Sequence, residues 1–478
     1  MLQGPRFPGP AAHASTLAGL KDRTIPTGII WWTAAGILVA VLVGMQMVAP
    51  IDALSWLSAL GLAHSALVFW EHGGSRVTAA GAFAVATGAF AYFPGLYLSF
   101  SPGRDDQPGR LLAAVCTVYF GQVITYYAAW ARLRAPVVSP TQPGDPRVLR
   151  WTLWTGISMM AVGALGQQYL GMGSTTLAGA AAFTGANMAA FAVIQMGRRP
   201  ALAALATIAA TFGFYVAVMF TGGGRLVLGG LALALAMHLA ARSRRRALKA
   251  TALFALPAGI IYLAQVRAEM VAATRGASET GLESVLAPLR TFARLIMMAD
   301  AGTLEMARGG TFFAALVVPV PRDLWAGKPP GLGVELAGVF RPELVRFGYS
   351  EAVLGHGEFF YNFGWPGVIV GIAVLAWFVA WLDRILARVH ARPLATRRDA
   401  LAQVAAVIAV AGLLDLVWTG TATYAGRAGQ RLIVILLLLA LFAWNPRTDR
   451  STDALSQAPR VAWRAAPDAH RRRDIARA

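Results

Sequence analysis

The sequence has little cysteine and almost no lysine. Its one cysteine, Cys116, lies in an apolar run, so no intrachain disulfide is possible. Lysine occurs at Lys21, Lys249 and Lys328 only, so arginine supplies nearly all of the positive charge. Residues 1–26 lack the apolar core of a cleavable signal peptide, and we expect the first membrane helix to act as the insertion signal.

Several motifs of soluble enzymes are also absent. The chain has no P-loop, no GxGxxG in a βαβ context, no HExxH, no CxxC and no DxD pair. We therefore expect no cofactor and no metal. If the chain acts on a diphosphate, arginine must neutralise the negative charge in place of a metal ion.

What the chain does contain is apolar sequence. Of its 478 residues 57% are hydrophobic, and the mean hydropathy is +0.56. A soluble multidomain protein is excluded, and an all-α polytopic membrane protein is predicted. About twelve segments are apolar enough to span a bilayer. They cover residues 28–49, 51–70, 77–100, 110–131, 151–171, 174–197, 200–221, 225–241, 249–267, 364–383, 400–421 and 430–444.

The positions of the arginines predict the orientation. With the N-terminus inside, the basic clusters at 132–150, 198–199, 242–249 and 384–398 all fall on the cytoplasmic side. The net charge of +19 is then a positive-inside signal, so no nucleic-acid partner is expected. Both termini are predicted to be cytoplasmic.

Five regions follow from this topology. Residues 1–26 and the basic tail 445–478 are expected to be disordered. Residues 27–267 form a bundle of about nine helices, and 364–444 add about three more. Between them, residues 268–363 form a large outer, periplasmic loop domain, which is expected to fold against the bundle.

Two groups of arginines fall on the outer side. Arg225 follows three glycines at a helix start, where backbone N–H groups and the helix dipole favour an anion. The alternative is an arginine that extends from a span end into the interface. Arg290 and Arg294 share one face of an amphipathic helix, where they either bind an anion or pair with Glu283 or Asp300.

The outer loop contains a proline-rich stretch, VVPVPRDLWAGKPPG, at 317–331. Arg322 and Lys328 flank Trp325 there, and the prolines stiffen the loop. Two cations and an aromatic ring suit a phosphate joined to a sugar. A structural cap with Trp325 as an interfacial anchor is the other interpretation.

Titratable groups appear in two further places. In GHGEFFYNFGWPG, residues 355–367, Glu358 is a candidate general base and His356 a helper, although an ordinary salt bridge also explains Glu358. Asp415 lies inside a predicted span. Because several helical turns separate it from Arg427 and Arg431, no direct pairing is expected within that helix.

These segments, in this order, resemble the bacterial oligosaccharide repeat-unit polymerases, the Wzy-type O-antigen and exopolysaccharide polymerases. The resemblance covers residues 221–371, through GGGR at a span start, PRDLWAGKP in the outer loop and GEFFYNFGWPG at the start of a late span. Within the last motif, Glu358, Asn362, Phe363, Gly364 and Gly367 fit the family pattern, whereas Phe360 and Tyr361 shift its aromatic positions. The N-terminal half is similar only as a series of apolar spans.

The resemblance implies a metal-independent glycosyltransferase of the bacterial inner membrane with a fold like that of the ligase and GT-C-type enzymes. Its substrates would be undecaprenyl-diphosphate-linked oligosaccharide units, with a flippase and a chain-length regulator as partners. Arg225, Arg322 and Glu358 would act in catalysis. The residues Arg290, Arg294, Lys328, Trp325, His356 and Arg427 would contact the diphosphate and sugars.

Two other functions remain open. A ligase of the same broad fold would move finished polymer onto another acceptor. A transporter or flippase for the lipid-linked unit would use a central polar pathway, for which a lone intramembrane carboxylate such as Asp415 is a candidate.

Overall fold

The structure is a computed structural model. It describes residues 27–103, 106–132, 144–170, 177–197, 200–219, 225–242, 246–253, 282–320, 324–346 and 349–443, with a few single positions between 255 and 265. The expected terminal segments 1–26 and 445–478, most of the expected span 249–267, and Arg322 lie outside these residues. The chain divides into two compact units, residues 1–435 and 436–478.

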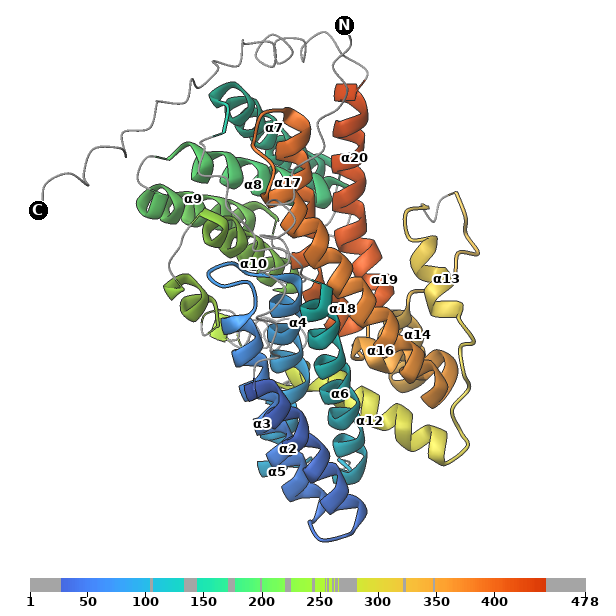
Figure 1. Ribbon diagram of the computed structural model, residues 1–478. Helices are drawn as coiled ribbons and strands as arrows, with labels where there is room; N and C mark the ends of the chain where they lie inside the picture. Colours follow the sequence, from blue (N-terminus) through green and yellow to red (C-terminus); the bar gives the residue numbers. More distant parts are fainter. Residues whose placement is uncertain are drawn as a thin grey trace, which may run out of the picture. The chain divides into compact units, whose positions relative to one another are not determined.

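The described part of the chain is helical and contains no strand (Figure 1). Its first half contains α2 (Thr27–Gly44), α3 (Pro50–Glu71), α4 (Ala79–Thr87), η1 (Gly88–Tyr92), α5 (Phe93–Phe100), α6 (Pro108–Arg132), α7 (Pro146–Leu170), α8 (Leu177–Met196), α9 (Pro200–Phe214), η2 (Tyr215–Met219) and α10 (Arg225–Arg242). The second half contains α12 (Glu283–Asp300), α13 (Gly310–Leu316), α14 (Leu332–Phe340), α15 (Pro342–Val345), α16 (Gly355–His390), α17 (Arg397–Ala411), α18 (Leu413–Thr419), α19 (Thr421–Tyr424), η3 (Ala425–Gly429) and α20 (Gln430–Ala443). The three η elements are π-helical turns.

Eight helical stretches among the described residues are long and apolar enough to cross a membrane. They are Pro50–Glu71, Ala79–Phe100, Pro108–Trp130, Pro146–Tyr169, Leu177–Met196, Gly355–His390, Arg397–Thr419 and Thr421–Phe442. Three shorter apolar helices, Ile30–Gly44, Leu205–Val218 and Leu226–Arg242, occupy further predicted spans. The described part of the chain is thus that of an all-helical polytopic membrane protein, and the number of twelve spans remains a prediction.

The segment that was predicted to form the outer loop contributes helices of its own. Helix α12 buries Val285, Leu289 and Phe292, and it packs against α6, η1 and α16. Its apolar residues recur at helical spacing, so the face that they form is removed from water by the bundle.

Two glycines break helices next to this segment. Gly364 has φ 64° and ψ −153° inside α16, and Gly420 has φ 87° between α18 and α19. A positive φ is costly for any residue with a Cβ atom. A span was predicted to begin at residue 364. The helix α16 begins earlier, at Gly355, and the non-helical backbone of Gly364 divides it into two helical stretches.

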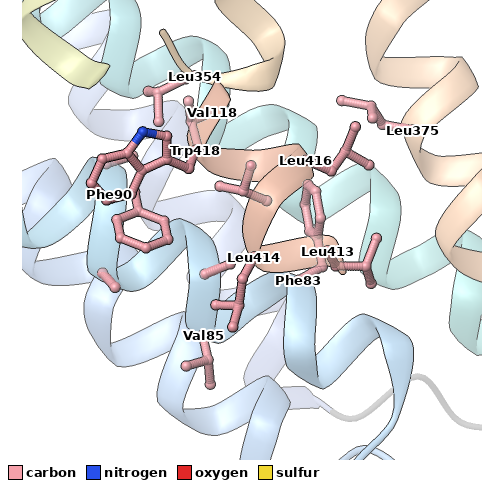
Figure 2. Packing of buried hydrophobic residues seen from close by; sticks show 14 of the residues in the cluster. Phe83, Val85, Phe90, Val118, Leu354, Leu375, Leu413, Leu414, Leu416 and Trp418 are labelled. Atoms are coloured by element: carbon pink, nitrogen blue, oxygen red, sulfur yellow. The ribbon is translucent and has the colours of Figure 1, made fainter. Parts of the chain in front are cut away.

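The core beneath the second break is tightly packed (Figure 2). Trp418 meets Phe90 edge-on with ring centroids 4.9 Å apart. Leu413 and Leu414 of α18 and Phe83 of α4 are buried in the same hydrophobic cluster. This packing fixes the end of α18 and therefore the position from which the chain turns at Gly420.

A polar cluster joins the start of α4 to α16. Asp383 accepts hydrogen bonds from the backbone N–H groups of Ala79 and Ala80, the latter at 3.2 Å. The buried Lys249 donates from Nζ to the carbonyl of His72 at 2.8 Å. Burial and, second, the charge of Lys249 lower the pKa of His72 to about 4, so this imidazole is neutral at pH 7. The carboxylate stabilises the positive end of α4.

The two glycine breaks have different surroundings, so alanine substitutions at Gly364 and Gly420 should lower the stability of the protein by different amounts. A Cβ atom at Gly420 would lie 2.2 Å from Oε2 of Glu358, whereas one at Gly364 would meet nothing nearer than Met306 Cε at 3.6 Å. Gly364→Ala should therefore cost only the backbone strain, about 1–3 kcal/mol. Gly420→Ala should cost roughly 2 kcal/mol more, because it also displaces a bound carboxylate. Unfolding midpoints in detergent test this, and equal shifts for the two variants would refute it.

Candidate functional site

A buried carboxylate lies between the two helix breaks. Glu358, near the start of α16, is completely buried. Its carboxylate accepts hydrogen bonds from Thr311 Oγ1 at 3.1 Å, from the backbone N–H of Thr421 at 2.6 Å and from Thr421 Oγ1 at 2.8 Å. Three donors satisfy a carboxylate that has been removed from solvent. The side chain thereby links α13, α16 and α19.

Asn362 extends this network on the same face of α16, four residues after Glu358. Its Nδ2 donates to Thr311 Oγ1 at 2.7 Å and to the carbonyl of Glu358 at 2.8 Å. Its Oδ1 accepts the backbone N–H of Gly309 at 2.8 Å. Glu358, Asn362, Thr311 and Thr421 together form what we call the Glu358 network. Two residues of the late motif, Glu358 and Asn362, therefore share one hydroxyl partner.

The sequence explains why the carboxylate of Glu358 can reach Thr421. Gly420 has no side chain, so the carboxylate can approach the backbone at the break. The positive φ of Gly420 also aims the N–H of Thr421, the first residue of α19, at the carboxylate. A carboxylate at a helix start is stabilised by the free N–H groups there.

A second group of charged side chains comes from the helices before and after Gly420. Arg427 Nη1 and Asp415 Oδ1 are 2.6 Å apart. Arg431 is also buried, and its guanidinium lies 3.6 Å from the centre of the Phe183 ring. Tyr215 packs edge-on against the same ring with centroids 6.3 Å apart. Asp415, Arg427, Arg431 and Tyr215 are called the cation cluster below.

The cation cluster carries an excess positive charge. It has two guanidinium groups and one carboxylate, and no ion pair to Arg431 occurs within the described ranges. The hydroxyl of Tyr215 is buried and has no hydrogen-bond partner. An uncompensated charge and a free donor are costly inside a membrane protein. An anion bound at this place would satisfy both groups.

Two π-helical turns meet the same cluster. Arg427 lies in η3, and Tyr215 is the first residue of η2. Single π-turns inside helices occur often at functional sites, because they shift side chains away from their regular positions. The cluster is thus built from irregular backbone on two helices that are far apart in sequence.

One expectation about these residues was wrong. Asp415 and Arg427 were predicted not to pair, since twelve residues of a straight helix separate two side chains by about 18 Å. They do pair, because Gly420 interrupts the helix between them and changes the direction of the chain.

The cations that were predicted to lie on the outer side differ in their surroundings. Arg290 binds Asp106 through Nε and Nη2 at 2.8–3.1 Å. A carboxylate from the 101–108 connection, in place of a bound anion, therefore offsets its repulsion with Arg294. Arg294 is half-buried and has no ion pair with any described residue. Arg225 begins α10, but its side chain, like all of Arg322, is outside the described part.

The remaining predicted residues do not meet at Glu358. Lys328 donates from Nζ to the carbonyls of Val318 and Val320, both at 2.8 Å. Trp325 meets Phe313 edge-on with centroids 6.3 Å apart. His356 points away from Glu358 into the bundle, where it packs against Gly121 of α6, and its Nε2 has no hydrogen-bond partner.

Sequence reasoning missed several members of the site. Thr311 and Thr421 carry hydroxyls that no motif distinguishes from other threonines. Arg431 was detectable, because it lies four residues after Arg427 and so on the same helical face. Tyr215 belongs to an apolar span and gave no signal. Within the described ranges, no group of three or more metal-ligating side chains is present.

Comparisons with known proteins add no name to this geometry. No family model, no curated protein and no solved structure matches the chain.

Proposed function

We propose that this chain polymerises undecaprenyl-diphosphate-linked oligosaccharide units at the outer face of a bacterial inner membrane. The observation that carries the proposal is the cation cluster, which holds one more positive than negative charge inside the bundle. A lipid-linked diphosphate has the charge and the membrane location to fill such a site. The motif residue Glu358 binds Thr421 directly after Gly420, and Asp415 and Arg427 of the cation cluster come from the helices before and after the same glycine.

The reaction is a glycosyl transfer. The acceptor hydroxyl oxygen of one lipid-linked unit attacks the anomeric carbon of the growing chain. The bond between that carbon and the diphosphate oxygen breaks, and undecaprenyl diphosphate leaves with the bonding electron pair. The hydroxyl proton passes to a base or to water. Negative charge grows on the leaving diphosphate, so fixed cations lower the barrier.

The roles follow from where the side chains lie. Arg427 and Arg431 would hold the leaving diphosphate. Arg225, Arg294 and Arg322 remain predicted as further diphosphate-binding cations. Glu358 was expected to act as the base. Its carboxylate is covered and already accepts three hydrogen bonds, so in this conformation a positioning role is favoured. It keeps α19, and hence Arg427, in register with α16.

The pairing of Asp415 with Arg427 bears on the transporter alternative. A proton carrier needs a carboxylate that alternates between charged and neutral forms. Asp415 Oδ1 is instead engaged by the guanidinium of Arg427 at 2.6 Å. This contact favours an anion-binding enzyme over a proton-coupled transporter.

The decisive experiment uses the purified protein in proteoliposomes and lipid-linked repeat units extracted from the source cells. Polymerisation predicts a ladder of products that differ by one repeat unit each. A ligase would give no ladder and would move preformed polymer to another acceptor. A transporter would make no new covalent product. A single band of unreacted repeat unit would refute the proposal.

A further inference from the structure

The segment that contains α13 exposes large apolar side chains. Leu316 is 79% exposed and Leu324 is 81% exposed. Phe313 and Val320 are exposed as well. These values match Ile369, which is 72% exposed on α16, one of the candidate spans. Side chains of this size exposed together mark an interaction surface, because water does not accommodate them well.

The sequence of the segment fits a membrane interface. Residues 310–321 contain no charged residue. An apolar run of about 10–14 residues is too short to span a bilayer and is typical of re-entrant or interfacial segments. The opposite face of α13 is buried, and α13 packs against α19 and α16. Both of these helices belong to candidate membrane spans, so the apolar face lies next to the bilayer.

The backbone of the segment supplies its own hydrogen bonds. The N–H groups of Val317, Val318 and Val320 donate to carbonyls within the segment. Pro319 has no N–H group to satisfy. The carbonyls of Val318 and Val320 accept from Lys328 Nζ. Lipid offers neither donors nor acceptors, so a segment in lipid must pair its own backbone groups. In water these two carbonyls could accept hydrogen bonds from solvent, so they would not require a lysine side chain.

From these observations we propose that residues 310–320 and 324–328 lie at the interface of the bilayer, in contact with lipid, and not in the aqueous space of a loop. The occupant of their apolar face is lipid. Lys328 secures the turn that follows α13 by binding the carbonyls of Val318 and Val320, and Trp325 lies at the polar boundary. The inference concerns placement in the membrane and does not depend on the proposed activity.

Spin labels test this placement. Leu316→Cys and Leu324→Cys are each labelled with a nitroxide in a Cys116→Ala background and reconstituted into phosphatidylethanolamine–phosphatidylglycerol liposomes. Ile369→Cys provides the lipid-facing reference. Glu343→Cys, at an exposed position of α15, provides the water-facing reference. Collision of the nitroxide with molecular oxygen reports exposure to lipid, and collision with a water-soluble nickel chelate reports exposure to water.

We expect both leucine positions to follow Ile369, with high oxygen access and low nickel access. Nickel access like that at Glu343 would overturn the proposal. So would exclusion of both reagents, or spin–spin broadening that disappears on dilution with unlabelled protein, because these indicate a protein partner or a second copy. Only preparations that elute as a single species are compared, and Cys116→Ser supplies a second background.

Discussion

Replacing Arg431 with methionine should abolish chain extension while leaving the protein folded. The guanidinium is buried and lacks an ion-pair partner among the described residues. If it holds the leaving diphosphate, its loss should reduce the rate by about 10²–10³-fold, as the removal of one preorganised donor does elsewhere. Methionine fills the space against Phe183 without a charge. Replacing a buried charge with an apolar side chain is often neutral or stabilising.

The assay is ladder formation in proteoliposomes, with the thermal unfolding midpoint measured on the same preparation. The matched control is Arg388→Met, which removes an exposed arginine at the far end of α16. We expect full activity from this control. Full-length ladders from Arg431→Met, or inactivity accompanied by a large drop in the unfolding midpoint, would contradict the assigned role.

The second large effect concerns Asp415. Asp415→Asn should destabilise the protein by about 3–5 kcal/mol, since it removes one partner of a buried ion pair. Arg427 loses its carboxylate at 2.6 Å, and two cations then remain in the cluster. Chemical unfolding in mixed micelles measures this loss. The pairing was absent from the sequence-based expectation, so the result also tests the break at Gly420.

A double variant separates charge from packing. Asp415→Asn combined with Arg431→Met restores the original charge excess of the cluster. We expect it to be more stable than Asp415→Asn alone, with a coupling energy of about 0.5–3 kcal/mol. Strict additivity would show that the two side chains do not interact. Wild-type stability in Asp415→Asn would show that the ion pair is unimportant.

The sequence predicted the helical class well, because membrane spans require long apolar runs. The same runs could not show where helices break. Gly364 and Gly420 are two glycines among 50 in the chain, and only the packed structure shows which ones adopt a positive φ. The error over Asp415 and Arg427 arose from treating residues 400–444 as regular helices.

The site was predicted in part. Glu358 was singled out as a candidate general base before a span, and Arg427 because it follows Asp415, a carboxylate inside a predicted span. Their partners were not predictable, since Thr311, Thr421 and Tyr215 come from three other helical elements and contact the site only through tertiary packing. Arg290 shows the converse, because a carboxylate at Asp106, far away in sequence, satisfies a cation that seemed available for substrate.

The most direct test is binding of undecaprenyl diphosphate to the cation cluster. Phosphorus NMR of the lipid in nanodiscs containing wild-type protein should show a broadened, shifted diphosphate signal. The same lipid with Arg431→Met should give the signal of empty nanodiscs, and undecaprenol should not compete. Equal binding by wild-type protein and Arg431→Met would contradict the account.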